Sequence, residues 1–224
     1  MRPRILSLDT TSEHGSLALI ENGVIVGELA MHSTEGFGHL LFGHVNDLLV
    51  THGWLLTDMD AFAAAAGPGS FTGIRVGLAA VKGLGAALGR PVVAVSSLQA
   101  VAWHGSAPLR AALIDARRDE VYGALYSASL QPVRPEVVTV LTHWLETLPG
   151  EGVELVSTDA VRLISALAGT SYLRFPVTQA PRALAGAVGS IASMRLAEGL
   201  APDPAAVEAN YVRRSDAELF WREF

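Results

Sequence analysis

The chain has 224 residues, half of them hydrophobic and 17% charged, which is the composition of a globular protein with a sizeable core. Its 16 basic and 22 acidic residues give a formal net charge of −6, and the basic residues are scattered, which disfavours a free-standing nucleic-acid binder. The absence of cysteine excludes disulfides, thiolate metal sites and a cysteine nucleophile. We expect a cytoplasmic protein with no membrane span.

The start of the chain predicts three consecutive strands. Residues 5–12, ILSLDTTS, indicate a buried strand that ends in a polar loop at Asp9, Thr10 and Thr11. GSLALI and VIVGELAM follow, and the Asn22-Gly23 turn between them is a strong hairpin signal because both residues tolerate a positive φ. Asp9 is either a metal-associated carboxylate, which many nucleotide-binding folds place at the end of the first strand, or an aspartate that accepts hydrogen bonds from its own turn.

Alternating helices and strands are predicted next. Residues 38–51 place an apolar stripe on one face of a helix. The stripe consists of Leu41, Val45, Leu48 and Leu49. Residues 60–66, DAFAAAA, fit a buried strand or a helix equally well. A second helix begins near Ser70 or Thr72 and ends at Gly89, and PVVAVS then predicts a strand and SLQAVAWHG a short helix.

The glycine loop AAAAGPGSFTGIRVG is the densest local signal in the chain. It fits neither the G-x-x-x-x-G-K-[ST] phosphate loop nor the dinucleotide pattern G-x-G-x-x-G, because Thr72 stands where each pattern needs glycine. The residues alone leave open a tight strand-to-helix turn or a phosphate cradle. The positions in question are Gly67, Pro68, Gly69, Ser70, Phe71, Thr72, Gly73 and Arg75.

Small residues recur along the helix that follows the loop. Gly73 and Gly77 are four residues apart, and each interior glycine costs about 0.5–1 kcal/mol relative to alanine. Either the helix packs closely on its own sheet, or it forms a seam with another subunit. The histidines at 32, 39, 44 and 52 show no metal-binding pattern, since His39 and His44 do not share a helical face and no HExxH motif exists. We expect no metal site.

The segment GSAP predicts a lobe boundary, with a first lobe over residues 1–105 and a smaller one over residues 106–224. RAALIDARRDEVYGALYSA reads as two strands joined by a charged turn from Arg117 to Glu120. The rest of the chain suggests two strand–helix pairs and a final helix.

Several segments resemble one known family. ILSLDTTSEHGSLALIENG, AAAAGPGSFTGIRVGLAAVKGLGAALGRPVVAVSSLQAVA and LIDARRDEVYGALY closely resemble the TsaB (YeaZ) family, as does NYVRRSD near the end of the sequence. The resemblance is strong over residues 4–126 and thin over residues 127–205. GPGSFTGIRVG is much more specific than a generic glycine loop.

The resemblance implies an α/β chain of the ASKHA (actin-like ATPase, ribonuclease H-like) fold, in two lobes with mixed sheets and with the final segment able to pack back on the first lobe. It implies a non-catalytic scaffold subunit required for N6-threonylcarbamoyladenosine (t6A) formation at position 37 of tRNAs reading ANN codons. Such a subunit pairs with the catalytic subunit TsaD and helps to recruit the ATPase TsaE. ATP and Mg²⁺ are then used by the assembled complex and not bound by this chain alone, and tRNA is met only through the complex.

The resemblance also identifies a degenerate nucleotide site. ASKHA enzymes clamp phosphates between two glycine-bearing hairpins, where glycine lets backbone amides approach the phosphate. Here the first loop is Asp9-Thr10-Thr11-Ser12 and the second begins Asp115-Ala116-Arg117, both without glycine. We therefore expect GPGSFTG to be a structural elbow that sets the following helix for subunit contact.

We expect the two helices of the first lobe to lie side by side and form the subunit seam, which would make the isolated chain a homodimer. The predicted seam residues are Leu41, Val45, Leu48, Gly73, Gly77, Ala80, Gly83 and Leu84. Replacing Gly77 or Gly83 by a bulky residue should weaken pairing and leave the monomer folded. Phe37-Gly38-His39 departs from the His-Ser pair that many relatives have there.

Two other functions compete with the scaffold role. A free-standing ASKHA small-molecule kinase or carbamoyl or acyl transferase would bind ATP and Mg²⁺ on its own, which the glycine-free loops argue against. An independent tRNA-binding protein conflicts with the acidic balance of the chain.

Overall fold

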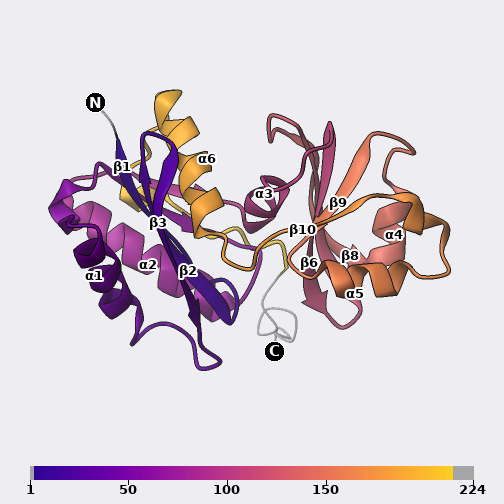
Figure 1. The fold of residues 1–224 in the computed structure, drawn as a ribbon, viewed down its shortest axis with the longest axis horizontal. Helices are drawn as coiled ribbons and strands as arrows, with labels where there is room; N and C mark the ends of the chain where they lie inside the picture. The colour runs from indigo at the N-terminus through magenta and orange to yellow at the C-terminus, as the bar shows by residue number, and fades with distance from the viewer. Residues whose placement is uncertain (1–2, 214–224) are drawn as a thin grey trace, which may run out of the picture.

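The computed structural model describes residues 3–213, which form two lobes side by side, each with a five-stranded mixed sheet (Figure 1). The first sheet has the order β3-β2-β1-β4-β5 and contains β1 (Arg4–Asp9), β2 (His14–Glu21), β3 (Val24–His32), β4 (Ala61–Ala65) and β5 (Val92–Val95). β1 pairs antiparallel with β2 and parallel with β4. The predicted hairpin is confirmed: Asn22 and Gly23 have φ of 55° and 79°. Residues 60–66 are confirmed as a strand, β4, rather than a helix.

Helices cover both faces of this sheet. α1 (Leu41–Thr51) and α2 (Phe71–Leu88) lie on one face, where they pack on Leu6 and Leu8 of β1. α6 (Ala185–Ala197) covers the other face and packs on Ile5 of β1 and Ile20 of β2. Successive side chains of β1 thus point to opposite faces of the sheet, as the pleat of a strand requires.

The ends of α2 lie where the sequence predicts them. The Ser70 side chain accepts a hydrogen bond from the Gly73 backbone N–H at 3.3 Å, and Gly89 ends the helix with a left-handed φ of 63°. Within residues 3–213, α2 is the one helix long and apolar enough to span a membrane. Its apolar side chains Ile74 and Val81 are buried against the sheet, so its hydropathy serves the core of the first lobe.

The second sheet repeats the strand order of the first. Read from its antiparallel edge, its order is β8-β7-β6-β9-β10, with β6 in the position of β1. Its strands are β6 (Leu109–Arg117), β7 (Glu120–Ser127), β8 (Pro132–Val140), β9 (Val153–Ser157) and β10 (Val177–Gln179). The remaining elements are α4 (Leu141–Glu146), α5 (Ala160–Leu167) and the 3₁₀ turns η1 (Leu56–Asp58), η2 (Ser171–Arg174) and η3 (Pro204–Ala206).

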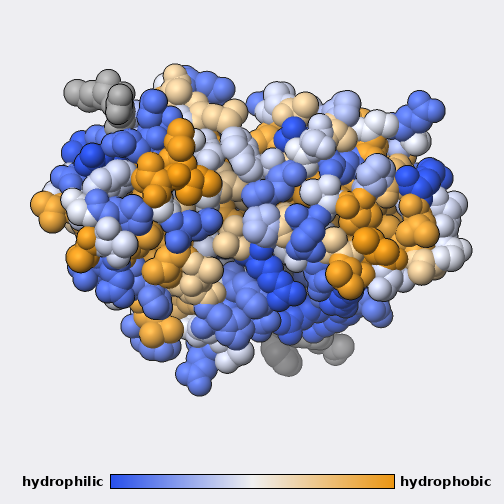
Figure 2. Space-filling view, in the orientation of Figure 1, coloured by the Kyte–Doolittle hydropathy of each residue, from blue (hydrophilic) through white to orange (hydrophobic). Residues whose placement is uncertain are grey.

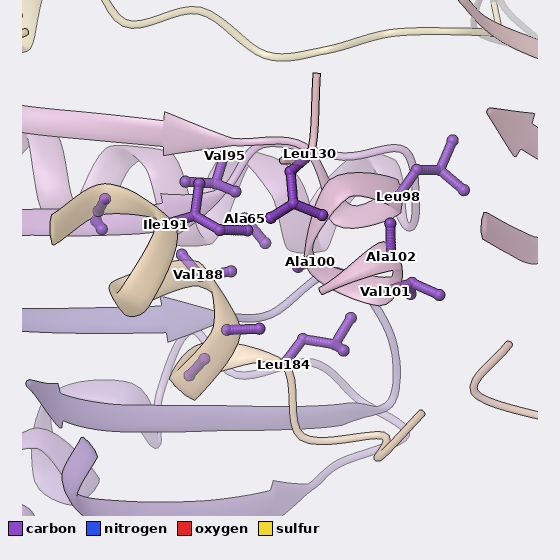
Figure 3. Packing of buried hydrophobic residues seen from close by; sticks show 14 of the residues in the cluster. Ala65, Val95, Leu98, Ala100, Val101, Ala102, Leu130, Leu184, Val188 and Ile191 are labelled. Atoms are coloured by element: carbon purple, nitrogen blue, oxygen red, sulfur yellow. The ribbon is translucent and has the colours of Figure 1, made fainter. Parts of the chain in front are cut away.

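The lobes share a continuous apolar core. α3 (Ser97–Ala102) lies between them, and its Leu98 and Val101 belong to one buried cluster with Leu184 and Val188 of the α6 segment (Figure 3). Ala112 and Tyr126 of the second sheet belong to the same cluster. This core places the ends of β1 and β6 close to the junction between the lobes (Figure 1).

The chain crosses back to the first lobe after β10. The Ala185 backbone N–H donates to the Ser16 hydroxyl at 2.9 Å, and the Ser7 hydroxyl donates to the Ala185 carbonyl at 2.7 Å. A Cβ on Gly189 would lie 2.4 Å from Ile20 Cγ1, so α6 approaches β2 as closely as only glycine permits. The boundary expected near residue 105 falls between α3 and β6, and α6 belongs to the first lobe.

Candidate functional site

The first polar loop is closed by the aspartate at its start. Asp9, 1% exposed, accepts hydrogen bonds from the Thr11 backbone N–H at 2.8 Å and from the Thr11 hydroxyl at 2.7 Å. Burial raises the pKa of the Asp9 carboxyl, and the two bonds from Thr11 oppose that shift. Of the two roles that the sequence leaves open for Asp9, the structure shows the turn-closing one.

The glycine loop packs directly on this first loop. The Ser70 backbone N–H donates to the Thr11 carbonyl at 2.6 Å, and the Thr10 hydroxyl donates to the Gly73 carbonyl at 2.7 Å. A Cβ on Gly73 would stand 1.9 Å from the Thr10 carbonyl oxygen, and one on Gly69 would stand 2.6 Å from that of Thr11. These glycines let two backbone segments touch, and the space beside Thr10 and Thr11 is filled by protein.

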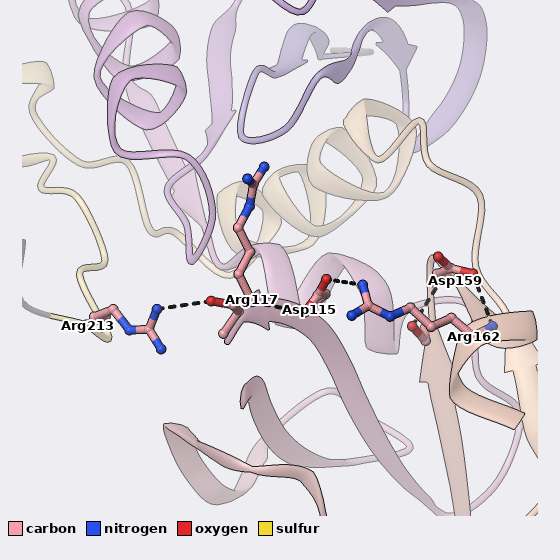
Figure 4. A network of polar contacts seen from close by, with 7 residues as sticks. Asp115, Arg117, Asp159, Arg162 and Arg213 are labelled. Atoms are coloured by element: carbon pink, nitrogen blue, oxygen red, sulfur yellow. Dashed lines mark hydrogen bonds and ion pairs between the residues drawn. The ribbon is translucent and has the colours of Figure 1, made fainter. Parts of the chain in front are cut away.

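The second loop is also closed by an aspartate. Asp115 accepts a hydrogen bond from the Arg117 backbone N–H at 2.9 Å and forms an ion pair with Arg162 of α5 (Figure 4). Arg117, Arg118 and Asp119 all have positive φ, so the predicted charged turn is confirmed as a tight hairpin. In Figure 4 the Arg117 side chain leaves this turn toward the first lobe.

A cavity of about 220 Å³ lies between the glycine loop, at Pro68 and Gly69, and the turn of the second loop, at Ala116 and Arg117. Its described lining residues include Phe71 and Ile74 of α2 and Arg117, Arg118 and Arg213, with no carboxylate among them. Figure 2 shows hydrophilic residues gathered where the lower edges of the lobes meet, beside the end of β6. The cavity is therefore small, basic and open to solvent.

The C-terminal motif NYVRRSD contributes one wall of this cavity. Tyr211 packs on Phe71 with ring centroids 5.1 Å apart, and its hydroxyl accepts a hydrogen bond from Arg75 Nε at 3.0 Å. Arg213 donates to the Ala116 carbonyl at 3.0 Å and pairs with Glu120. The last three letters of the motif lie outside the described residues. The motif thus joins the glycine loop to the turn of the second lobe.

Sequence reasoning missed a polar cluster that joins the lobes. Glu136 of β8 accepts hydrogen bonds from Tyr126 at 2.9 Å, from Asn210 at 2.6 Å and from the Ser96 hydroxyl that caps α3. Asn210 also donates from its side chain to the Gly67 carbonyl at 3.3 Å. Burial and the neighbouring Glu136 carboxylate raise the pKa of the Tyr126 hydroxyl. No local pattern marks Glu136 or Asn210, because their partners are distant in sequence.

The predicted seam residues of α1 require a correction. Leu41, Val45 and Leu48 are 1–4% exposed and pack in the core of the first lobe. The period of the apolar stripe predicts the helix correctly, but the stripe faces the chain's own sheet. The solvent side of α1 instead presents Phe42 and Val50, which are 57% and 68% exposed.

The predicted seam residues of α2 divide into two groups. Gly73, Gly77 and Ala80 face the interior of the first lobe. A Cβ on Gly77 would lie 2.6 Å from the Thr10 hydroxyl oxygen, so a bulky residue at Gly77 disturbs the fold of the monomer. Gly83 is exposed and has no atom within 4 Å of a Cβ built on it, and Leu84 is half-buried. The expectation that bulk at Gly77 would spare the fold is therefore wrong, and Gly83 remains available to a partner.

Comparisons with known proteins agree with this architecture. The TsaD family model, described as tRNA N6-adenosine threonylcarbamoyltransferase, matches residues 36–170. The Escherichia coli protein named tRNA threonylcarbamoyladenosine biosynthesis protein TsaB is 39% identical over 127 residues, covering 55% of this chain and 54% of the relative. The Bacillus subtilis protein of the same name is 32% identical over 149 residues, covering 64% of this chain and 65% of the relative.

A solved structure extends the likeness over both lobes. It is a Pseudomonas aeruginosa protein described as uncharacterized with similarity to peptidase YEAZ, with a TM-score of 0.79 and 28% identity. It covers 94% of this chain and 100% of its own. The matches to curated relatives span about half to two thirds of their length. The two mixed-sheet lobes have the actin-like, ribonuclease H-like fold, and the chain belongs to the TsaB (YeaZ) family, within the wider family that the TsaD model describes.

Proposed function

We propose that this chain is the non-catalytic scaffold subunit required for t6A formation at position 37 of tRNAs reading ANN codons. Its curated relatives are named as threonylcarbamoyladenosine biosynthesis proteins, and its matching family model is named for the transferase. These names connect the chain to the pathway. The geometry of the two loops supports the non-catalytic role within that pathway.

The observation that carries the non-catalytic role is the contact between Gly73 and Thr10. Phosphate cradles need backbone N–H groups that point into free space. Here the carbonyl of Thr10 faces the position that a Cβ on Gly73 would take, and the Thr11 N–H is bonded to Asp9. The first half of an ASKHA phosphate clamp is therefore occupied by the chain's own backbone, and we propose that the chain alone binds no nucleotide.

The proposed partner is a TsaD-like catalytic subunit that docks on the solvent side of α1 and α2. That side presents Phe42 and Val50 of α1 and the small exposed residues Ala79 and Gly83 of α2, which allow close approach of another helix. In the absence of TsaD, the same face would pair two copies as a homodimer. We further propose that the cytoplasmic complex recruits a TsaE-like ATPase, uses ATP and Mg²⁺, and alone contacts tRNA.

Reconstitution tests this function. A TsaD-like enzyme and a TsaE-like ATPase from the same cell are supplied with threonylcarbamoyl adenylate and an unmodified tRNA that reads an ANN codon. We expect t6A, measured by mass spectrometry of digested tRNA, to form over repeated cycles only when this chain is added. Equal t6A yield without the chain would overturn the proposal.

The arginine-lined cavity favours one alternative, a free-standing enzyme that acts on an anionic substrate. Arg117, Arg118 and Arg213 supply positive charge between the lobes, where ASKHA enzymes place their ligands. Binding of ATP and Mg²⁺ by the isolated chain, detected by calorimetry, would favour this alternative over the scaffold.

A further inference from the structure

Three side chains with metal-binding atoms meet at one end of the first sheet, away from the seam of α1 and α2. Glu13, His14 and His32 each offer one nitrogen or oxygen atom, and these atoms lie within 4.8 Å of one another. Spacing along the chain gives no hint of this group, because His14 and His32 are brought together only by strand pairing. Nothing in the proposed scaffold role uses these residues.

The strand register holds the two imidazoles together. His14 of β2 lies directly opposite His32 of β3, and cross-strand neighbours place their Cβ atoms about 4.5–5.5 Å apart. Their ring centroids are 4.9 Å apart. The Ser33 backbone N–H donates to the Glu13 backbone carbonyl at 2.9 Å, and the Ser12 hydroxyl accepts a hydrogen bond from the His14 backbone N–H at 3.1 Å. The backbone that carries the three side chains is thus ordered before any ligand arrives.

The composition of the group selects a class of metal. Two imidazoles and one carboxylate are ligands that Zn²⁺ and similar divalent transition metals prefer. Mg²⁺ and Ca²⁺ instead require mostly oxygen atoms. His14 Nε2 and Glu13 Oε1 are 3.6 Å apart, close to the separation that two ligands of one tetrahedral zinc have at bond lengths of about 2.0–2.2 Å. We propose that Glu13, His14 and His32 bind one divalent ion of the zinc type, with its fourth position open to water.

Arg182 competes with the proposed ion for one nitrogen atom of His14. Its Nη1 lies 2.6 Å from His14 Nε2, and an arginine can only donate, so the imidazole accepts through the lone pair that a metal would use. Arg182 is exposed and precedes α6 on the segment that crosses between the lobes. The metal and the guanidinium therefore compete for one nitrogen, and metal binding releases Arg182 from β2.

Titration of zinc chloride into the full, untagged chain tests the site, with calorimetry as the readout and excess Mg²⁺ in the buffer. We expect one Zn²⁺ per chain. His32→Ala and Glu13→Gln should each weaken binding at least about tenfold, as loss of a direct ligand costs no less than loss of an outer partner. Arg182→Ala should tighten binding several-fold, because it removes a competing donor and a positive charge.

His39→Ala is the matched control, since His39 is an exposed histidine outside the group. It should bind zinc as the wild type does. All four substitutions are at exposed positions, and thermal melts without metal should confirm intact folds. Wild-type affinity in both His32→Ala and Glu13→Gln, or weaker binding in Arg182→Ala, would overturn the assignment.

Discussion

Asp9 and Asp115 hold equivalent positions in the two lobes and use their carboxylates in the same way. Asp9 ends β1 and Asp115 lies near the end of β6, the middle strands of the two sheets. Each Oδ1 accepts a hydrogen bond from the backbone N–H two residues later, from Thr11 at 2.8 Å and from Arg117 at 2.9 Å. The equivalent position in each lobe thus carries an aspartate that stabilises a turn.

Gly73 and Gly83 lie in the same helix, α2, but have opposite surroundings. A Cβ on Gly73 meets the Thr10 carbonyl at 1.9 Å, whereas one on Gly83 meets no atom within 4 Å. Gly73→Ala should lower the free energy of unfolding by about 3 kcal/mol, because the loop or the helix must shift. Gly83→Ala should raise it by about 0.5–1 kcal/mol through better helix propensity. Urea denaturation measures both, and equal effects would contradict the close packing of the two loops.

The buried carboxyl of Asp9 predicts a pH dependence. Burial raises its pKa in the folded state above the ordinary value of 3.8. Such a group favours the folded state most below that ordinary value, and its contribution is lost as the pH rises and the buried carboxyl must ionise. Asp9→Asn keeps a carbonyl acceptor for Thr11 and does not ionise. The melting temperature of the wild type minus that of the variant should therefore fall as the pH rises above the ordinary value of 3.8.

A difference in melting temperature that stays constant over this range would show that Asp9 ionises as it does in the unfolded chain. A rising difference would mean that the bonds from Thr11 outweigh burial. Asp47→Asn, at an exposed position of α1, is the control for the change of an aspartate to asparagine.

The proposed docking face predicts that partner binding and stability respond to different residues of α1 and α2. Phe42→Asp and Gly83→Arg should abolish pairing with the TsaD-like subunit and leave the melting temperature nearly unchanged, since both positions face solvent. Leu48→Ala should instead cost about 2–5 kcal/mol of stability, because Leu48 is buried in the core. Light scattering and thermal melts separate the two effects. Normal pairing by both surface variants would place the docking face elsewhere.

The Glu136 cluster predicts how firmly the lobes are joined. Glu136→Ala removes the acceptor of the Tyr126 hydroxyl and one of the two acceptors of the Asn210 amide, which should cost about 1–3 kcal/mol. Hydrogen exchange should rise at the backbone N–H of Asn210, which donates to the Ala66 carbonyl at 2.8 Å. Glu146→Ala, at an exposed position of α4, should change neither quantity. Unchanged exchange in the Glu136 variant would show that the apolar core alone holds the lobes.

Features set by neighbouring residues could be predicted from the sequence. The Asn22-Gly23 turn, the Ser70 cap and the Gly89 end of α2 depend on side chains and φ angles within a few residues. The period of the α1 stripe was also clear, but a period does not say whether the apolar face meets the chain's own sheet or a partner. That ambiguity led to the misplaced seam at Leu41, Val45 and Leu48.

Contacts between distant segments could not be predicted from one sequence. Asn210 and Glu136 are 74 residues apart, and their hydrogen bond depends on the return of the chain to the lobe junction. The pairing of His14 with His32 depends on the register of β2 and β3. In both cases the residue types are ordinary, and only the fold gives them a shared site.

Light-scattering chromatography of the purified chain with a TsaD-like protein from the same cell, alongside ATP titration of each alone, tests the central claim most directly. We expect a stable heterodimer and no ATP binding by this chain, because the Gly73–Thr10 contact fills the first half of the phosphate clamp. Tight ATP binding by the isolated chain without complex formation would contradict it and place a free-standing enzyme first.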